Sequence, residues 1–105
     1  MTLGNISTLE VCFAAPVEIA LIDNVEMILD VLKTHDGCLG YTMSSLQHVS
    51  NSILITGYWR DEESMLRHFA SVSFSELFES LIPRSFSLRF KTFFTRYESE
   101  GCHVF

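Results

Sequence analysis

Two kinds of hydrophobic periodicity alternate along this chain, and their order constrains the fold more than any other feature. Residues 7–14 alternate apolar and polar side chains in the manner of a half-buried strand. Residues 16–35 instead repeat apolar side chains at helical spacing, with Pro16 suited to the first turn and Asp36-Gly37 to the stop. The chain therefore begins with a predicted strand followed by an amphipathic helix.

The middle of the chain has the pattern of a hairpin. Residues 38–47 alternate again, residues 48–52 are polar, and residues 53–59 form a strongly apolar segment typical of a central strand. Alternation places two sets of side chains on opposite faces of the last strand: Ile53, Ile55, Gly57 and Trp59 on one, and Leu54, Thr56 and Tyr58 on the other.

A second helical region follows, in two pieces. Asp61 is a good N-cap for a helix that runs through Phe69, and a break is expected at residues 71–73. Ser73 and Glu76 have capping-box spacing and predict the start of a second short helix, which should end at Pro83.

The last periodic segment, residues 86–97, is the longest predicted strand, with Phe86, Leu88, Phe90 and Phe94 on one face. The resulting order is strand, helix, strand, strand, helix, strand. It predicts one α+β domain over residues 1–105 with a ferredoxin-like arrangement: a four-stranded antiparallel sheet with its helices on one face. Residues 6–98 would form the core, and residues 99–105 a tail.

One face of that sheet would have no helix to cover it. Leu54, Tyr58, Phe93 and Tyr97 fall on this face by alternation. An uncovered apolar face predicts a partner, and the simplest partner is a second copy of the chain. We therefore expect a homodimer that forms through Leu54, Tyr58 and Phe93.

Composition narrows the class of protein. The chain is 48% hydrophobic and 19% charged and contains nine Phe, so an ordered domain with a large aromatic core is expected. Its net charge of −6, with no basic run, argues against nucleic acid or an anionic membrane as partner. Three Cys without CxxC spacing, four scattered His and no signal-peptide pattern favour a cytoplasmic protein without disulfides or a metal site.

Three short segments carry a family resemblance. They are Gly37-Cys38-Leu39-Gly40-Tyr41, then Gly57-Tyr58-Trp59-Arg60-Asp61-Glu62-Glu63-Ser64, and finally His68-Phe69-Ala70-Ser71 with Phe74. Together they resemble the antibiotic biosynthesis monooxygenase family of dimeric α+β barrels, over roughly residues 6–98. The resemblance implies a cavity between the helices and the sheet, a back-to-back dimer, and an oxygenase that needs no cofactor.

The same resemblance implies two catalytic residues. Trp59 matches the family Trp at the end of the third strand, and His68 matches the family His on the following helix. In the polyketide monooxygenases an Asn four residues before the Trp helps to bind substrate, and here that position is Ile55. We expect Trp59 and His68 to orient and deprotonate a small phenolic substrate, although each could instead serve only in packing.

Further residues are candidates for substrate binding. Tyr41 could donate a phenolic hydrogen bond to a ligand or could complete the core. Ile55 occupies the position of the family Asn. Phe69, Phe74 and Phe90 could form an aromatic wall for a planar substrate or could be core residues.

Two other functions remain open from the sequence. The first is a non-enzymatic dimeric protein that binds a hydrophobic metabolite, which the absence of the Asn at Ile55 favours. The second is haem degradation, which the related haem enzymes carry out with a Trp and an axial His. Those two residues align with His68 and Phe78, so haem breakdown is the weaker hypothesis.

Overall fold

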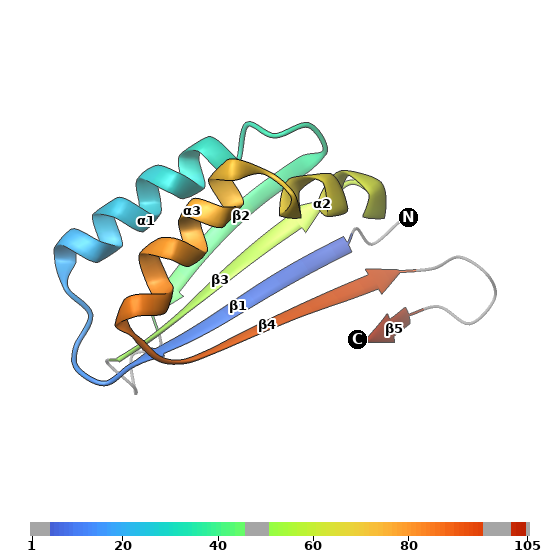
Figure 1. Ribbon diagram of the computed structural model, residues 1–105. Coiled ribbons are helices and arrows are strands. Elements are labelled where there is room, and N and C mark those ends of the chain that lie inside the picture. Colours follow the sequence, from blue (N-terminus) through green and yellow to red (C-terminus); the bar gives the residue numbers. More distant parts are fainter. Residues whose placement is uncertain (1–4, 46–50, 96–101, 105) are drawn as a thin grey trace.

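An antiparallel sheet with three helices on one face forms the body of the protein (Figure 1). The computed structural model describes residues 5–45, 51–95 and 102–104. The predicted α+β class and ferredoxin-like arrangement are confirmed. The strands lie in the order β2-β3-β1-β4-β5. The elements along the chain are β1 Asn5–Phe13, α1 Ile19–Leu32, β2 Cys38–Ser45, β3 Ser52–Trp59, α2 Glu62–Phe69, α3 Val72–Leu81, the 3-10 turn η1 Ile82–Arg84, β4 Ser85–Thr95 and β5 Cys102–Val104.

Helix α1 covers the sheet with a stripe of buried side chains at helical spacing, Leu21, Val25, Leu29 and Leu32. Its first residue is Ile19, so the prediction that Pro16 occupies the first helical turn is wrong. The backbone before Ile19 is extended, and the carbonyl oxygen of Glu18 accepts the first helical bonds. The helix therefore starts one turn later than the sequence suggested.

The break between the second and third helices is confirmed, and each helix has a side-chain cap. An oxygen of the Asp61 carboxylate accepts a hydrogen bond from the Ser64 backbone N–H at 2.8 Å, as predicted. At α3 the cap is Ser71, whose hydroxyl accepts from the Phe74 N–H at 3.1 Å. The prediction that Ser73 is the cap is wrong, because the helix has already begun at Val72.

The register of the strands fixes which side chains face the helices. Leu9 lies between Ile55 of β3 and Phe90 of β4, and Val11 lies between Ile53 and Leu88. These positions face the helical layer and form most of the sheet's contribution to the core. The predicted face assignment of β3 is therefore confirmed.

The sheet has one strand more than the four predicted. Residues 102–104, which were expected to belong to a tail, form β5 and pair antiparallel with β4, with Val104 opposite Phe93. A strand of three residues is too short to produce a recognisable alternation in the sequence, so periodicity could not reveal it.

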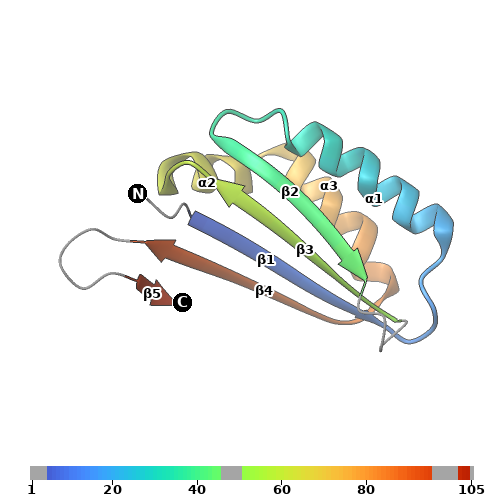
Figure 2. The same ribbon diagram turned by 180° about the vertical axis from the view of Figure 1, so that it is seen from behind.

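No helix of the described residues lies on the opposite face of the sheet (Figure 2). One row across it is apolar, because Ile6 of β1 lies between Tyr58 of β3 and Phe93 of β4. The side chain of Tyr58 is 40% exposed. In the adjacent row, Thr8 lies between Thr56 and Lys91, so this row is polar. The apolar part of this face therefore lies at the end of the sheet where β1 begins. We call this surface the bare sheet face.

None of the helices in the described part of the chain combines the length and apolar character that crossing a membrane requires.

Gly37, in the turn between α1 and β2, gives a direct test of this arrangement. Its φ is +86°, and a methyl group there would overlap the side chain of Ser64 on α2. We expect Gly37→Ala to lower the free energy of unfolding by about 2 kcal/mol or more, because a left-handed backbone alone costs roughly 1–2 kcal/mol for an L-residue. Urea denaturation measures this change.

Gly40 provides the matched control, since no heavy atom of the described residues other than Gly40 and its two chain neighbours lies within 4 Å of the position its Cβ would occupy. Gly40→Ala should leave stability within about 0.5 kcal/mol of the wild type. Equal effects of the two substitutions would contradict the packing described for the α1–β2 turn.

Candidate functional site

Tyr41, Trp59 and His68 meet at one end of the sheet, beneath α2. Tyr41 comes from β2, Trp59 is the last residue of β3, and His68 is in the last turn of α2. The ring centroids of Trp59 and His68 are 4.2 Å apart, and those of Tyr41 and Trp59 are 5.9 Å apart with nearly perpendicular planes. The structure thus brings together the two predicted catalytic residues and one predicted binding residue.

His68 is hydrogen-bonded through both ring nitrogens. Its Nε2 lies 2.6 Å from the Tyr41 hydroxyl oxygen, and its Nδ1 lies 2.8 Å from Nδ1 of His35. The side chain is buried because α2 directs Met65 and His68, three residues apart, toward the sheet. His68 therefore links a strand residue and a residue that follows α1.

His35 is the functional candidate that sequence reasoning missed. It is half-buried, just beyond the end of α1, and its contact with His68 spans 33 residues of sequence. No local pattern marks it, because the contact depends on the turn at Gly37, which brings the end of α1 against α2. The backbone N–H of Arg60 donates to the Gly37 carbonyl oxygen at 2.8 Å and holds that turn.

Burial sets the protonation of the pair. It lowers the pKa of His68 to about 3, with a further lowering from the neighbouring His35. Burial also raises the pKa of the Tyr41 hydroxyl far above its ordinary value, against a smaller opposing effect of a hydrogen bond with the Ser7 side chain. At neutral pH both groups are therefore uncharged, and a neutral imidazole faces a neutral phenol.

Gly57 makes room for the Tyr41 ring. It lies opposite Tyr41 in the β2–β3 register, and a Cβ at this position would be 2.8 Å from Cζ of Tyr41 and 2.9 Å from Oγ of Ser7. Any side chain here would displace the ring from beneath α2. Gly57 therefore determines whether the Tyr41 hydroxyl can reach His68.

Trp59 is completely buried, and its indole nitrogen has no hydrogen-bond acceptor within range among the described residues. A buried donor left without a partner costs about 1–3 kcal/mol, so such atoms are rare outside functional sites. Asn5, the cross-strand neighbour of Trp59 on β1, is also buried. The indole N–H is thus a buried donor without a partner among the described residues.

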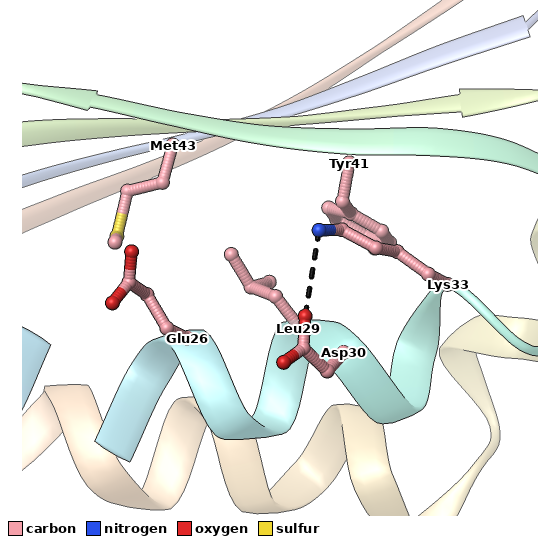
Figure 3. Close-up of a pocket in the computed structure, with 6 residues that line it drawn as sticks. All are labelled: Glu26, Leu29, Asp30, Lys33, Tyr41 and Met43. Atoms are coloured by element: carbon pink, nitrogen blue, oxygen red, sulfur yellow. Dashed lines mark hydrogen bonds and ion pairs between the residues drawn. The ribbon is translucent and has the colours of Figure 1, made fainter. Parts of the chain in front are cut away.

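A groove runs between α1 and the edge strand β2, close to Tyr41 (Figure 3). One part has a volume of ≈ 290 Å³ and is lined by α1 residues together with Tyr41 and Met43. A second part, of ≈ 370 Å³, shares Glu26 and Met43 with the first and continues to the apolar Val17 and Ile53. We call the two parts together the α1–β2 groove. The α1 residues of the first part are Glu26, Leu29, Asp30 and Lys33.

A second, smaller depression lies on the other side of His68. It has a volume of ≈ 220 Å³ and is lined by His35, Asp36, Ser64, Arg67 and His68. Asp36 forms ion pairs of 3.7 Å with Arg67 and with Arg60, and all three of these side chains are exposed. We call this depression the His35 hollow.

The three predicted aromatic binding residues form one cluster behind His68. Phe69, Phe74 and Phe90 have ring centroids 5.0–5.9 Å from one another. The His68 ring lies 4.9 Å from Phe74, and Phe78 joins the cluster from α3. The rings pack mainly on one another, so they form a wall that supports the imidazole.

Ile55 lies in the hydrophobic core, 2% exposed, between Leu9 and Met43 of the adjacent strands. Its neighbour Ile53 lines the α1–β2 groove. Among the described residues, no group of three or more His, Cys, Asp or Glu could hold a metal ion.

Comparison with known proteins places this geometry in context. The family profile for antibiotic biosynthesis monooxygenase matches residues 15–80, which is more than half of the chain. No protein with curated function matches the sequence.

Several solved structures share the fold. A protein from Deinococcus radiodurans assigned to the same family is 23% identical with a TM-score of 0.75, covering 90% of this chain and 91% of its own. SnoaB, a cofactor-independent oxygenase from Streptomyces nogalater, is 15% identical with a TM-score of 0.74 (94% and 99% covered). PA3566 from Pseudomonas aeruginosa is 16% identical with a TM-score of 0.74 (92% and 98% covered). At these identities the likeness shows the fold.

The lowered pKa of His68 predicts how stability depends on pH. Folded His68 titrates at about 3 and unfolded His68 near 6.5. Between these values the unfolded chain binds more protons, so His68 makes the protein less stable as the pH falls through this window, by roughly 1 kcal/mol per pH unit. Urea denaturation of wild type and His68→Gln from about pH 7 to pH 4 isolates this contribution. Parallel pH dependences in the two proteins would contradict a buried, neutral His68.

Proposed function

Because this chain belongs to the antibiotic biosynthesis monooxygenase family, we propose that it is a cofactor-independent oxygenase acting on a small phenolic substrate in the α1–β2 groove. The observation that carries the proposal is the hydrogen bond of 2.6 Å between a buried, neutral His68 and the hydroxyl of Tyr41, which lines that groove. In this proposal, the pair acts as the proton acceptor for a ligand in the groove.

The chemistry requires a base and a dry environment rather than a metal. A phenolic substrate that loses its O–H proton becomes a phenolate with negative charge on the ring carbon para to the oxygen, and this carbon reduces O2 and bonds to it as a peroxide anion. Return of the proton gives a hydroperoxide, which loses water to leave a carbonyl group. The phenol is oxidised by four electrons to a quinone as its para C–H carbon becomes C=O, and O2 supplies the oxygen atoms of the new carbonyl group and of the water.

The side chains of the site have distinct roles in this scheme. The Tyr41 hydroxyl accepts the substrate proton as its own proton passes to His68 Nε2. Trp59 orients the pair, because its ring packs on His68 and Tyr41 with centroids 4.2 Å and 5.9 Å away. The wall formed by Phe69, Phe74 and Phe90, together with Ile55 in the core, excludes water and holds the imidazole in position.

The groove suits a small ring system. Its first part has a volume of ≈ 290 Å³, at the lower end of the roughly 300–1,000 Å³ typical of ligand pockets, which favours one or two rings. Met43 and Leu29 offer apolar contact, and Lys33 can pair with a phenolate oxygen (Figure 3). SnoaB, described as a cofactor-independent oxygenase, has the same fold, which supports the reaction class.

A second candidate function is a dimeric protein that binds a hydrophobic metabolite without converting it. The apolar Ile55 favours this alternative, because it offers no amide to hold a substrate oxygen.

Oxygen consumption distinguishes these functions. We expect the purified protein to take up O2 with at least one member of a panel of phenols and hydroquinones. Tyr41→Phe should lower the rate about 100-fold, the scale of a positioned proton-transfer group. Tyr58→Phe removes the same hydroxyl from the opposite face of the sheet and should leave the rate unchanged. Phenol binding without O2 uptake would favour the binding protein. A protein that neither binds phenols nor takes up O2 would refute both functions.

We also propose that two copies of the chain pack through their bare sheet faces, with Tyr58, Phe93 and Leu54 at the contact. The apolar row of Tyr58, Ile6 and Phe93 supports this arrangement, since no helix covers it (Figure 2). Burying such a row is favourable only if it meets a second apolar surface.

Tyr58→Asp should therefore dissociate the dimer, because each copy would bring an unpaired carboxylate into the contact. Light scattering at micromolar protein should show a dimer for wild type and a monomer of unchanged helical content for the variant. Ile19→Asp changes an exposed apolar residue on α1, 78% exposed, and should leave the dimer intact. A wild-type monomer, or a dimeric Tyr58→Asp variant, would contradict this interface.

A further inference from the structure

The contact between His35 and His68 requires a shared proton. Their Nδ1 atoms lie 2.8 Å apart, within hydrogen-bonding distance. Two nitrogens this close are favourable only when one carries a hydrogen and the other presents a lone pair. The pair is therefore a hydrogen bond between imidazoles, whose direction depends on the tautomers.

The tautomer of His68 links both of its contacts. A neutral imidazole has one N–H and one lone pair. If the Tyr41 hydroxyl donates to Nε2, then Nδ1 of His68 carries the hydrogen and donates to His35. If His35 donates to His68 instead, Nε2 carries the hydrogen and donates to the Tyr41 oxygen. The three residues thus form a continuous hydrogen-bonded chain that is consistent in either direction.

The two ends of this chain reach different surfaces. Tyr41 lines the α1–β2 groove, and His35 lines the His35 hollow together with His68, which is itself only 2% exposed. We propose that Tyr41, His68 and His35 form a proton relay that connects the groove to solvent in the hollow. His35 is then a proton-relay residue that does not touch the substrate.

Each step of the relay transfers one proton and no electrons. The Tyr41 O–H bond breaks as the Nε2–H bond of His68 forms, and the Nδ1–H bond of His68 breaks as the Nδ1–H bond of His35 forms. His35 then releases its Nε2 proton to water in the hollow, and Tyr41 takes a proton from the groove. The reverse sequence of transfers returns a proton from the hollow to the groove. Only the use of the relay in catalysis rests on the proposed function; the relay itself does not.

The charged groups around the hollow are compatible with proton release. Asp36 lies in the turn after α1 and pairs with Arg67 from α2 and Arg60 after β3. Glu63 of α2 pairs with Arg67 at 3.0 Å. On the inner side, His68 faces Tyr41, whose neighbour Cys38 is a half-buried thiol on β2. The exposed carboxylates and guanidinium groups offset one another, so water remains the natural acceptor.

Hydrogen exchange tests the relay without any substrate. The ring N–H of a buried His68 would otherwise exchange with solvent only when the structure opens, at the rate of the α2 backbone amides. With a relay it should exchange much faster than those amides, as measured by NMR on protein with ¹⁵N-labelled histidine. His35→Phe fills the same place without carrying protons and should slow the exchange about 100-fold, the scale of a lost proton-transfer group.

Two further variants complete the experiment. Thr34→Ala, next to His35, should leave the exchange rate unchanged. In His35→Ala, the His68 ring proton should exchange slowly in buffer alone and faster when imidazole is added, because imidazole can occupy the enlarged hollow. This comparison also tests the relay if His35→Phe does not fold.

The outcomes separate the relay from the proposed function. An His68 ring proton that exchanges no faster than the α2 amides, or an unchanged rate in His35→Phe, overturns the relay whatever the activity. Exchange that depends on His35 in a protein that takes up no O2 supports the relay and refutes the oxygenase.

Discussion

The hydrogen bond between Tyr41 and His68 is the interaction on which the rest of the site depends. It joins the edge strand β2 to α2 across β3, and it requires a glycine at position 57 so that the phenol ring can lie beneath the helix. Both groups are buried and uncharged at neutral pH, because burial disfavours the imidazolium and the phenolate alike. A polar pair held in this way is costly to leave unsatisfied, so its geometry is closely fixed.

Several features of the fold converge on that pair. The left-handed turn at Gly37 brings His35 against His68, and the aromatic wall of Phe69, Phe74 and Phe90 supports the imidazole from the other side. The α1–β2 groove reaches Tyr41, while the His35 hollow reaches His68. The site is therefore a short polar path through an apolar layer, and each end meets a different surface.

The fold could be predicted largely from the sequence, because its long elements have unambiguous periodicity and β3 alternates cleanly between its two faces. The site could be predicted only in part. The family resemblance pointed to Trp59 and His68, but no local signal marks His35, whose contact with His68 spans 33 residues of sequence. The cap at Ser71 was missed because Ser73 has the same chemistry two residues later.

The central claim is that a phenolic ligand binds in the α1–β2 groove and reaches Tyr41. Titration of hydroquinone into ¹⁵N-labelled protein, followed by NMR, tests it most directly. The account predicts saturable shift changes at Tyr41, Met43 and the facing residues of α1, weakened in Tyr41→Phe. Changes confined to the bare sheet face, or none at saturating hydroquinone, would contradict it.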